Sequence, residues 1–471
     1  MKNKLIILFL ILIVFLTSFI GSINKITSNK GIDQHIVYKD TNNCDSNDKE
    51  FCTHLPLVII DTGNKEIPGE ERDGSTITTN VKIIDNKSGG NHLEDKSKVN
   101  TLANIRYRGN SSMYFDKKGY LLKFVHEDGT ENKEKVMGMK KHDEWALHGP
   151  FLDKTLIRNY LWYHISSKIM DYAPDSRFCE LYVDGVYQGV YLMVETPTRA
   201  DESRMPISKY NDGDDFTSYI VRLDKGSLNP LENVDTFSGD TYNRLMKFDV
   251  IYPGKNKLNQ ELNKFISEDI SKFEKALYSY DYDSVRYGYR NYIDVNSFVD
   301  YYIINEFTQN YDAGSMSTYI YKDLKGDFGI FVWDFNSANN FYLDPIAIDD
   351  LRFQWNTWYY MFMKDEYFTQ RIIDRYHYLR KNYLNEEYLL NYIDDIVEYL
   401  GPAIDRNFEV WGYTFEQEKG LLQPIDRNVT SYEEAIKQLK EHIINRGRFL
   451  DENIDTIKQF SSESKVKKFN H

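Results

Sequence analysis

The sequence is poor in cysteine, and this excludes a zinc site. Among 471 residues only Cys44, Cys52 and Cys179 are cysteines, and no cluster of cysteine and histidine accompanies them. Cys44 and Cys52 lie close together in a polar segment, which is typical of a small disulfide-closed loop in an exported protein. Cys179 stands at the start of a predicted strand, where a buried and unreactive thiol is expected.

Negatively charged residues outnumber positively charged ones. The chain has 58 Lys and Arg against 72 Asp and Glu, which gives a formal net charge of −14. The sequence therefore excludes a broad nucleic-acid-binding surface and favours basic partners. Neither an internal repeat nor a sustained heptad pattern is present. A hydrophobic content of 41% with 15% aromatic residues predicts a folded protein, and the length suffices for two or three domains.

The longest apolar run is at the N-terminus. Residues 5–21 read LIILFLILIVFLTSFIG and follow Lys2 and Lys4. The run is long for the apolar core of a signal peptide and short for a membrane-spanning helix, so residues 1–22 predict either a cleaved signal or a membrane anchor. Residues 23–54 are polar and predict a tether. We therefore expect an exported or membrane-anchored protein.

Two halves follow the tether. Residues 55–198 predict strands, one helix and further strands, including a hairpin whose two-residue turn is Asp184-Gly185. The helix has apolar residues at a spacing of four, with Asp153 placed as its cap. Residues 199–471 show mainly helical patterns, and Ser431 with Glu434 predicts a capping box before the last helix. One β-hairpin, within residues 310–341, interrupts this second half.

The hairpin places two aspartates at its open end. Strands over residues 318–322 and 328–333 would pair in antiparallel fashion and bring Asp312 close to Asp334. Two neighbouring carboxylates repel each other unless a cation lies between them, and Mg²⁺ prefers carboxylate and phosphate oxygens. A phosphotransferase needs one such acid on the metal and another at the acceptor hydroxyl. The alternative is that Asp312 begins a turn and Asp334 caps the strand exit.

A second motif lies in the first half, in the sequence RYRGNSSMYFDKKGYLLKF. A turn with Gly109 and two serines next to basic residues can hold phosphate groups through backbone N–H groups and positive charge. The alternative is a solvated basic hairpin. The basic residues around this turn are Arg106, Arg108, Lys117, Lys118 and Lys123.

Taken together, these segments resemble the spore coat protein H (CotH) kinase family of atypical protein kinases. The matching stretches include LPLVIIDTG, DEWALHGPFLDKTLIRNYLWYHI, ELYVDGVYQGVYLMVETP, FVDYYIINEFTQNYDAGSMSTYIYKD and GIFVWDFNSANN, and the similarity covers roughly residues 55–455. The resemblance implies an α+β, divergent kinase-like fold of two lobes: a β-rich N-lobe over residues 55–198 and a helical C-lobe over residues 199–471. It also implies ATP with Mg²⁺ or Mn²⁺ between the lobes.

The resemblance assigns roles to individual residues. Asp312 resembles the catalytic aspartate and Asp334 the metal-binding one, while Glu195 ends the strand where the hinge between the lobes is expected. Lys123 is preferred over Lys118 as the lysine that contacts the ATP phosphates. The residues implied in nucleotide binding are Arg108, Gly109, Asn110, Ser111, Ser112, Lys118, Lys123 and Glu195.

Two positions depart from the family pattern. Ser317 stands where kinases place a metal-binding asparagine, and Asn336 stands where many family members have an aspartate. Ser317 and Asn336 are therefore the expected, weaker partners of Asp334 in a metal site.

The function implied is phosphorylation of serines in spore coat or surface proteins. The substrate expected is a protein with accessible serines, and the negative net charge of this chain favours a basic one. Two alternatives stay open: a surface structural or adhesion protein that retains an inactive kinase-like fold, and a transferase that moves AMP on the same fold.

Overall fold

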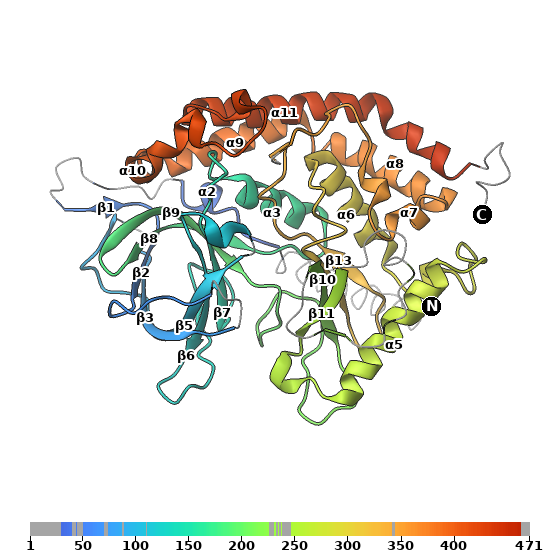
Figure 1. The fold of residues 1–471 in the computed structure, drawn as a ribbon, viewed down its shortest axis with the longest axis horizontal. Coiled ribbons are helices and arrows are strands. Elements are labelled where there is room, and N and C mark those ends of the chain that lie inside the picture. Colours follow the sequence, from blue (N-terminus) through green and yellow to red (C-terminus); the bar gives the residue numbers. More distant parts are fainter. Residues whose placement is uncertain are drawn as a thin grey trace, which may run out of the picture.

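The computed structural model describes residues 30–39, 44, 50–69, 74–86, 89–109, 111–225, 230–231, 234, 237, 246–341 and 344–462. The predicted leader, half of the tether and Asn110 lie outside these ranges. The described chain has a mixed α+β fold, in which a β-barrel and a second sheet lie side by side beneath a layer of helices (Figure 1). No helix in the described ranges combines the length and the apolar character needed to cross a membrane.

The barrel accounts for the β-rich first half. Its strands are β2 (Leu57–Asp61), β3 (Ile77–Ile84), β5 (Val99–Arg108), β6 (Gly119–Val125), β7 (Glu144–His148), β8 (Ser176–Val183) and β9 (Val186–Glu195). They close in the order β2-β3-β5-β6-β7-β9-β8, through parallel pairing of β2 with β8. Because side chains alternate along a strand, Tyr120, Leu122 and Phe124 of β6 fill the barrel core while Lys123 faces outward.

The hairpin of β8 and β9 confirms the turn predicted at Asp184-Gly185. Val183 pairs with Val186, and the two turn residues have φ angles of 49° and 78°. Positive φ at both central residues defines the tight turn that suits the twist of two antiparallel strands.

The second sheet has the order β11-β10-β12-β13. Its strands are β10 (Tyr219–Lys225), β11 (Met246–Tyr252), β12 (Thr318–Lys322) and β13 (Gly329–Phe331). The predicted hairpin is therefore present as β12 and β13, but it does not stand alone among helices. β12 pairs on its other side with β10, in a register that joins Tyr319 to Arg222 and Thr318 to Leu223.

Helices cover both sheets. α3 (Arg158–Ile169) lies between the barrel and the second half, and Asp153 Oδ2 accepts a hydrogen bond from the first helical N–H, that of Arg158. The other long helices are α5 (Gln260–Leu277), α6 (Val295–Thr308), α8 (Glu366–Arg380), α9 (Glu386–Leu400), α10 (Pro402–Trp411) and α11 (Tyr432–Asn453). At the start of α11 the Ser431 side chain accepts from the Glu434 N–H, as predicted.

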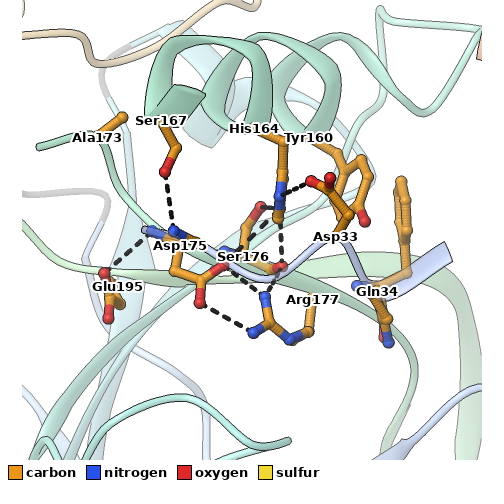
Figure 2. A network of polar contacts seen from close by, with 12 residues as sticks. Asp33, Gln34, Tyr160, His164, Ser167, Ala173, Asp175, Ser176, Arg177 and Glu195 are labelled. Carbon is orange, nitrogen blue, oxygen red and sulfur yellow. Dashed lines mark hydrogen bonds and ion pairs between the residues drawn. The ribbon is translucent and has the colours of Figure 1, made fainter. Parts of the chain in front are cut away.

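The segment before the barrel is docked onto the helices. Asp33, just ahead of α2 (Gln34–Val37), pairs with His164 of α3 (Figure 2). It also pairs with Lys168 of α3 and accepts a hydrogen bond from Tyr392 of α9. Gln34 exchanges two hydrogen bonds with the backbone of Phe178 in β8. These contacts fix the segment between the barrel and the helical layer.

The cysteine predictions are confirmed. Cys44 and Cys52 form a disulfide, and Cys179 is a buried free thiol. Burial raises the pKa of Cys179 well above its ordinary value, so the thiolate is disfavoured.

Candidate active site

The candidate site lies where the outward face of the barrel meets one face of the second sheet. Ile105 of β5 points into the barrel core, so Arg106 and Arg108 on either side of Tyr107 point outward. The guanidinium carbon of Arg108 lies 4.9 Å from the ring centroid of Trp333, which follows β13. This cation–π contact joins the barrel to the second sheet directly beside Asp334.

Asp334 lies in a left-handed backbone conformation, with φ at 61°. Tyr163 and Asn159 of α3 accept hydrogen bonds from the N–H groups of Asp334 (3.2 Å) and Phe335 (2.7 Å). Such φ values are uncommon outside glycine and concentrate at functional sites. Of ten non-glycine residues with positive φ in the described ranges, five fall between residues 309 and 340: Gln309, Ser317, Asp334, Asn339 and Asn340.

Few groups stabilise the negative charge of the Asp334 carboxylate. Burial raises its pKa, the hydrogen bond from the N–H of Asn336 (3.1 Å) and the positive charge of Arg108 lower it, and the negative charge of Asp224 raises it again. Within the described ranges that N–H is its one hydrogen-bond donor, and no cationic side chain forms an ion pair with it. A carboxylate held in this way favours a bound cation.

Asp312 belongs to the turn that joins α6 to β12. Its carbonyl oxygen accepts hydrogen bonds from the N–H groups of Met316 (2.7 Å) and Ser315 (3.3 Å). Asn310, two residues earlier, donates from Nδ2 to the carbonyl oxygen of Asp334 at 3.0 Å. The backbone segments of the two predicted acids are thus held at the same end of the second sheet.

The two expected partners of Asp334 differ in their surroundings. Ser317 directly precedes β12 and has a φ of 48°. The amide oxygen of Asn336 accepts a hydrogen bond from Asn159 Nδ2 at 2.8 Å, so it is already engaged with α3. No group of three or more His, Cys, Asp or Glu side chains with the arrangement of a metal site is found within the described ranges.

Gly109 directly follows β5, and a short 3₁₀ helix, Ser111–Tyr114, begins two residues later. Gly109 has a φ of 124°, and a Cβ there would collide with Ser112 Oγ, so this position requires glycine. Nearby, Lys118 Nζ donates to the carbonyl oxygen of Met113 at 2.6 Å and lies over the ring of Tyr107.

The two remaining lysines of this motif have different settings. Lys123 is on the outward face of β6, half exposed, with carboxylate oxygens of Glu131 and Asp143 at 3.6 and 3.8 Å. Lys117 is buried: its Nζ donates to the carbonyl oxygen of Val190 (2.8 Å) and to Asn407 Oδ1 (2.7 Å). Burial holds the pKa of Lys117 well below its usual value, and its contacts attach the turn to α10.

Glu195 ends β9 as predicted, but its carboxylate takes part in a buried network. It accepts a hydrogen bond from the N–H of Asp175 at 3.0 Å (Figure 2). It also pairs with Arg204 at 2.7 Å. These contacts fix the chain as it leaves the barrel.

Known proteins resemble this chain over most of its length. The model of the CotH kinase protein family matches residues 105–450, which include the glycine turn, Asp312 and Asp334. The chain belongs to this family. It is also 23% identical over 365 residues to the inner spore coat protein H of Bacillus subtilis (strain 168), an alignment that covers 75% of this chain and 87% of the relative.

This CotH-family chain contributes further polar residues that the sequence analysis missed. Arg222 and Asp224 of β10 and Asp249 of β11 lie on the second sheet, where Arg222 contacts both acids, at 2.9 Å for Asp249 and 3.6 Å for Asp224. Burial lowers the pKa of Arg106, and the positive charges of Arg108 and Arg222 lower it further. The charge of Arg222 on the second sheet therefore acts on the barrel arginine Arg106 across the junction.

Proposed function

We propose that this CotH-family chain is an atypical protein kinase, which transfers the γ-phosphate of ATP to serine hydroxyls of a protein. One observation carries the proposal: the Asp334 carboxylate, held by a left-handed turn, forms no ion pair within the described ranges, and Arg108 of the barrel lies nearby. Phosphoryl transfer relies on positioning and on charge stabilisation, and this junction combines carboxylates for a metal with guanidinium groups for phosphates.

In this proposal the barrel is the N-lobe and the second sheet with its helices is the C-lobe of a divergent kinase fold. ATP would lie at the junction, with its phosphates toward Arg108 and the turn at Gly109. The residues fit a divalent cation, Mg²⁺ or Mn²⁺, because Asp334 offers carboxylate oxygens in a partly buried setting. When bound, that ion would neutralise charge on the phosphate groups.

In this proposal each site residue has a separate role. Asp312 would accept a hydrogen bond from the substrate serine and orient its hydroxyl toward the phosphate. Arg108, fixed in place by Trp333, would bind phosphate oxygens, and Lys123 would lie further along the same outward face. The hydrogen bonds that Tyr163 and Asn159 accept from the N–H groups of Asp334 and Phe335 hold the turn, so that the Asp334 carboxylate is placed before any ligand binds.

The partner we propose is a protein with accessible serines, preferably basic because this chain is acidic. The similarity to a spore coat protein supports a location in the spore coat. Residues 5–21 would serve in export or membrane attachment and lie outside the described ranges.

The test is an assay with the purified full chain, labelled ATP, Mg²⁺ or Mn²⁺, and basic serine-rich peptides. We expect transfer by the wild type and a loss of about 10²-fold or more for Asp334→Ala, since a group that stabilises transition-state charge is removed. The matched control is Asp327→Asn, an exposed aspartate in the β12–β13 turn at the opposite end of the same hairpin, which should retain full activity.

The outcomes separate the alternatives. Equal background labelling by wild type and Asp334→Ala would refute catalysis and favour the structural or adhesion role. Mass spectrometry of the modified peptide would distinguish a phosphate from an AMP adduct, and an AMP adduct would replace kinase activity by nucleotidyl transfer.

A further inference from the structure

We infer that Asp224, on β10, is the second carboxylate of the cation site and faces Asp334 across the end of the second sheet. The inference rests on the proposed function, because it names a ligand for the cation that the proposed kinase would use. Neither the sequence motifs nor the family resemblance pointed to this residue.

The sheet register places Asp224 at the site. Pairing between β10 and β12 runs as far as Leu223 and Thr318, so Asp224 and Ser317 are the next residues along two neighbouring strands. β13 continues on the other side of β12 toward Trp333 and Asp334. Strand ends that share one edge of a sheet bring their next residues together, and the charge of Asp224 acts on Asp334.

The surroundings of Asp224 leave one oxygen available. The side chain is buried, with 6% of the residue exposed. Its Oδ1 accepts a hydrogen bond from the N–H of Lys225 at 2.7 Å, whereas its Oδ2 lies 3.6 Å from Arg222 Nε, too far for a hydrogen bond. Arg222 Nε has no hydrogen-bond partner within the described ranges, which confirms that the two groups do not engage fully.

The amides near Asp334 are less suitable ligands. Asn336 Oδ1 accepts from Asn159 Nδ2, and Asn339 Oδ1 accepts from Trp162 Nε1, both at 2.8 Å. Coordination through either oxygen would first break a hydrogen bond to α3. Asp224 and Asp334 need no such exchange, and two carboxylates completed by phosphate oxygens form the set that Mg²⁺ favours.

The inference also accounts for the departure at Asn336. Family members with an aspartate there would have a carboxylate two residues after Asp334. In this chain the carboxylate of Asp224 on β10 takes that part, and the Asn336 amide holds the turn against α3 through Asn159.

The experiment measures cation binding apart from catalysis. Mn²⁺ is titrated into the full-length protein with a non-hydrolysable ATP analogue, and bound Mn²⁺ is followed by electron paramagnetic resonance. We expect Asp224→Asn to weaken Mn²⁺ binding by about tenfold or more. The exposed control Asp327→Asn should bind like the wild type. Wild-type affinity in Asp224→Asn would overturn the inference.

A second measurement needs no variant, so it is decisive even where Asp224→Asn fails to fold. Fe²⁺ bound in place of Mn²⁺ is made to generate hydroxyl radicals, and backbone cleavage is mapped by mass spectrometry. Cuts near both 224 and 334 support the inference, and cuts near 334 without any in β10 refute it. If the wild type binds Mn²⁺ as expected but transfers no phosphate, the proposed function fails while the assignment of Asp224 stands.

Discussion

A buried ion pair behind the candidate site allows a sharp test of the packing that positions it. Arg446 of α11 and Glu306 of α6 have side-chain exposures of 0% and 1%, and their charged groups are in direct contact. Arg446 also donates to the carbonyl oxygen of Asp350, and Glu306 accepts from the N–H groups of Arg352 and Phe353. The pair therefore joins two helices and a loop, six residues before Asp312.

Replacing Arg446 with methionine keeps much of the volume and removes the charge. Glu306 would then be a buried carboxylate without its cation, and breaking a buried pair from one side costs about 3–5 kcal/mol. The backbone N–H donors to Glu306 remain, so we expect a decrease of about 3 kcal/mol in the free energy of unfolding at pH 7.

The loss should shrink in acid. Burial already raises the pKa of Glu306, and Arg446 opposes that rise. Without Arg446 the pKa rises further, so the folded variant binds a proton more readily than the unfolded chain. A raised carboxyl pKa means that stability falls as pH increases through it, and the Arg446→Met variant should recover part of its loss between pH 7 and pH 5.

Urea unfolding followed by tryptophan fluorescence at both pH values measures these differences. Arg448 offers a matched control on the same helix, because its pair with Glu386 is at the surface, with 63% of the Arg448 side chain exposed. Arg448→Met should cost less than about 1 kcal/mol. Equal losses for the two variants at pH 7, or no recovery of Arg446→Met at pH 5, would refute the reasoning.

Two further predictions concern protonation and thiols. Burial lowers the pKa of His442 to about 3, so the unfolded state binds a proton at higher pH than the folded state does. The free energy of unfolding therefore falls as pH decreases below 6.5, and His442 should account for about 2 kcal/mol of that decrease between pH 7 and pH 5. His442→Gln should remove that part of the difference between urea unfolding free energies at the two pH values, and an unchanged difference would contradict the assignment. Reduction of the Cys44–Cys52 disulfide, whose cysteines are eight residues apart, should lower the free energy of unfolding by about 2.5 kcal/mol because the unfolded chain gains freedom. A lower melting temperature would measure this loss. Cys179 should resist a thiol reagent until the protein unfolds, and rapid labelling of the native protein would contradict its burial.

Local patterns predicted local structure well. The Asp184-Gly185 turn, the cap at Ser431 and the disulfide depend on residues close in sequence, and each is present in the structure. Asp334 could be proposed as a site residue from the sequence because the motif that contains it, WDFN, is contiguous. Such features are specified by short-range sterics and hydrogen bonding, which a sequence displays directly.

The pairing of distant strands was not predictable in this way. The strands YIVRLDK and MKFDVIY carry a β pattern, but they were overlooked among the helical signals that surround them. β10 pairs with β12, whose residues lie about a hundred positions later, and no local signal reports that partnership. Arg222 and Asp224 were missed for this reason. Lys117 shows a related limit, because only the tertiary fold reveals that a lysine in a basic motif is buried against α10.

The docked N-terminal segment has a consequence for the order in which the molecule is completed. Asp33 contacts Tyr392, 359 residues later in the chain. During synthesis the second half of that docking site does not exist until α9 has emerged from the ribosome. The hydrogen bond between Asp33 and Tyr392 therefore closes a loop that spans most of the chain, and it can form only after α9 has been made.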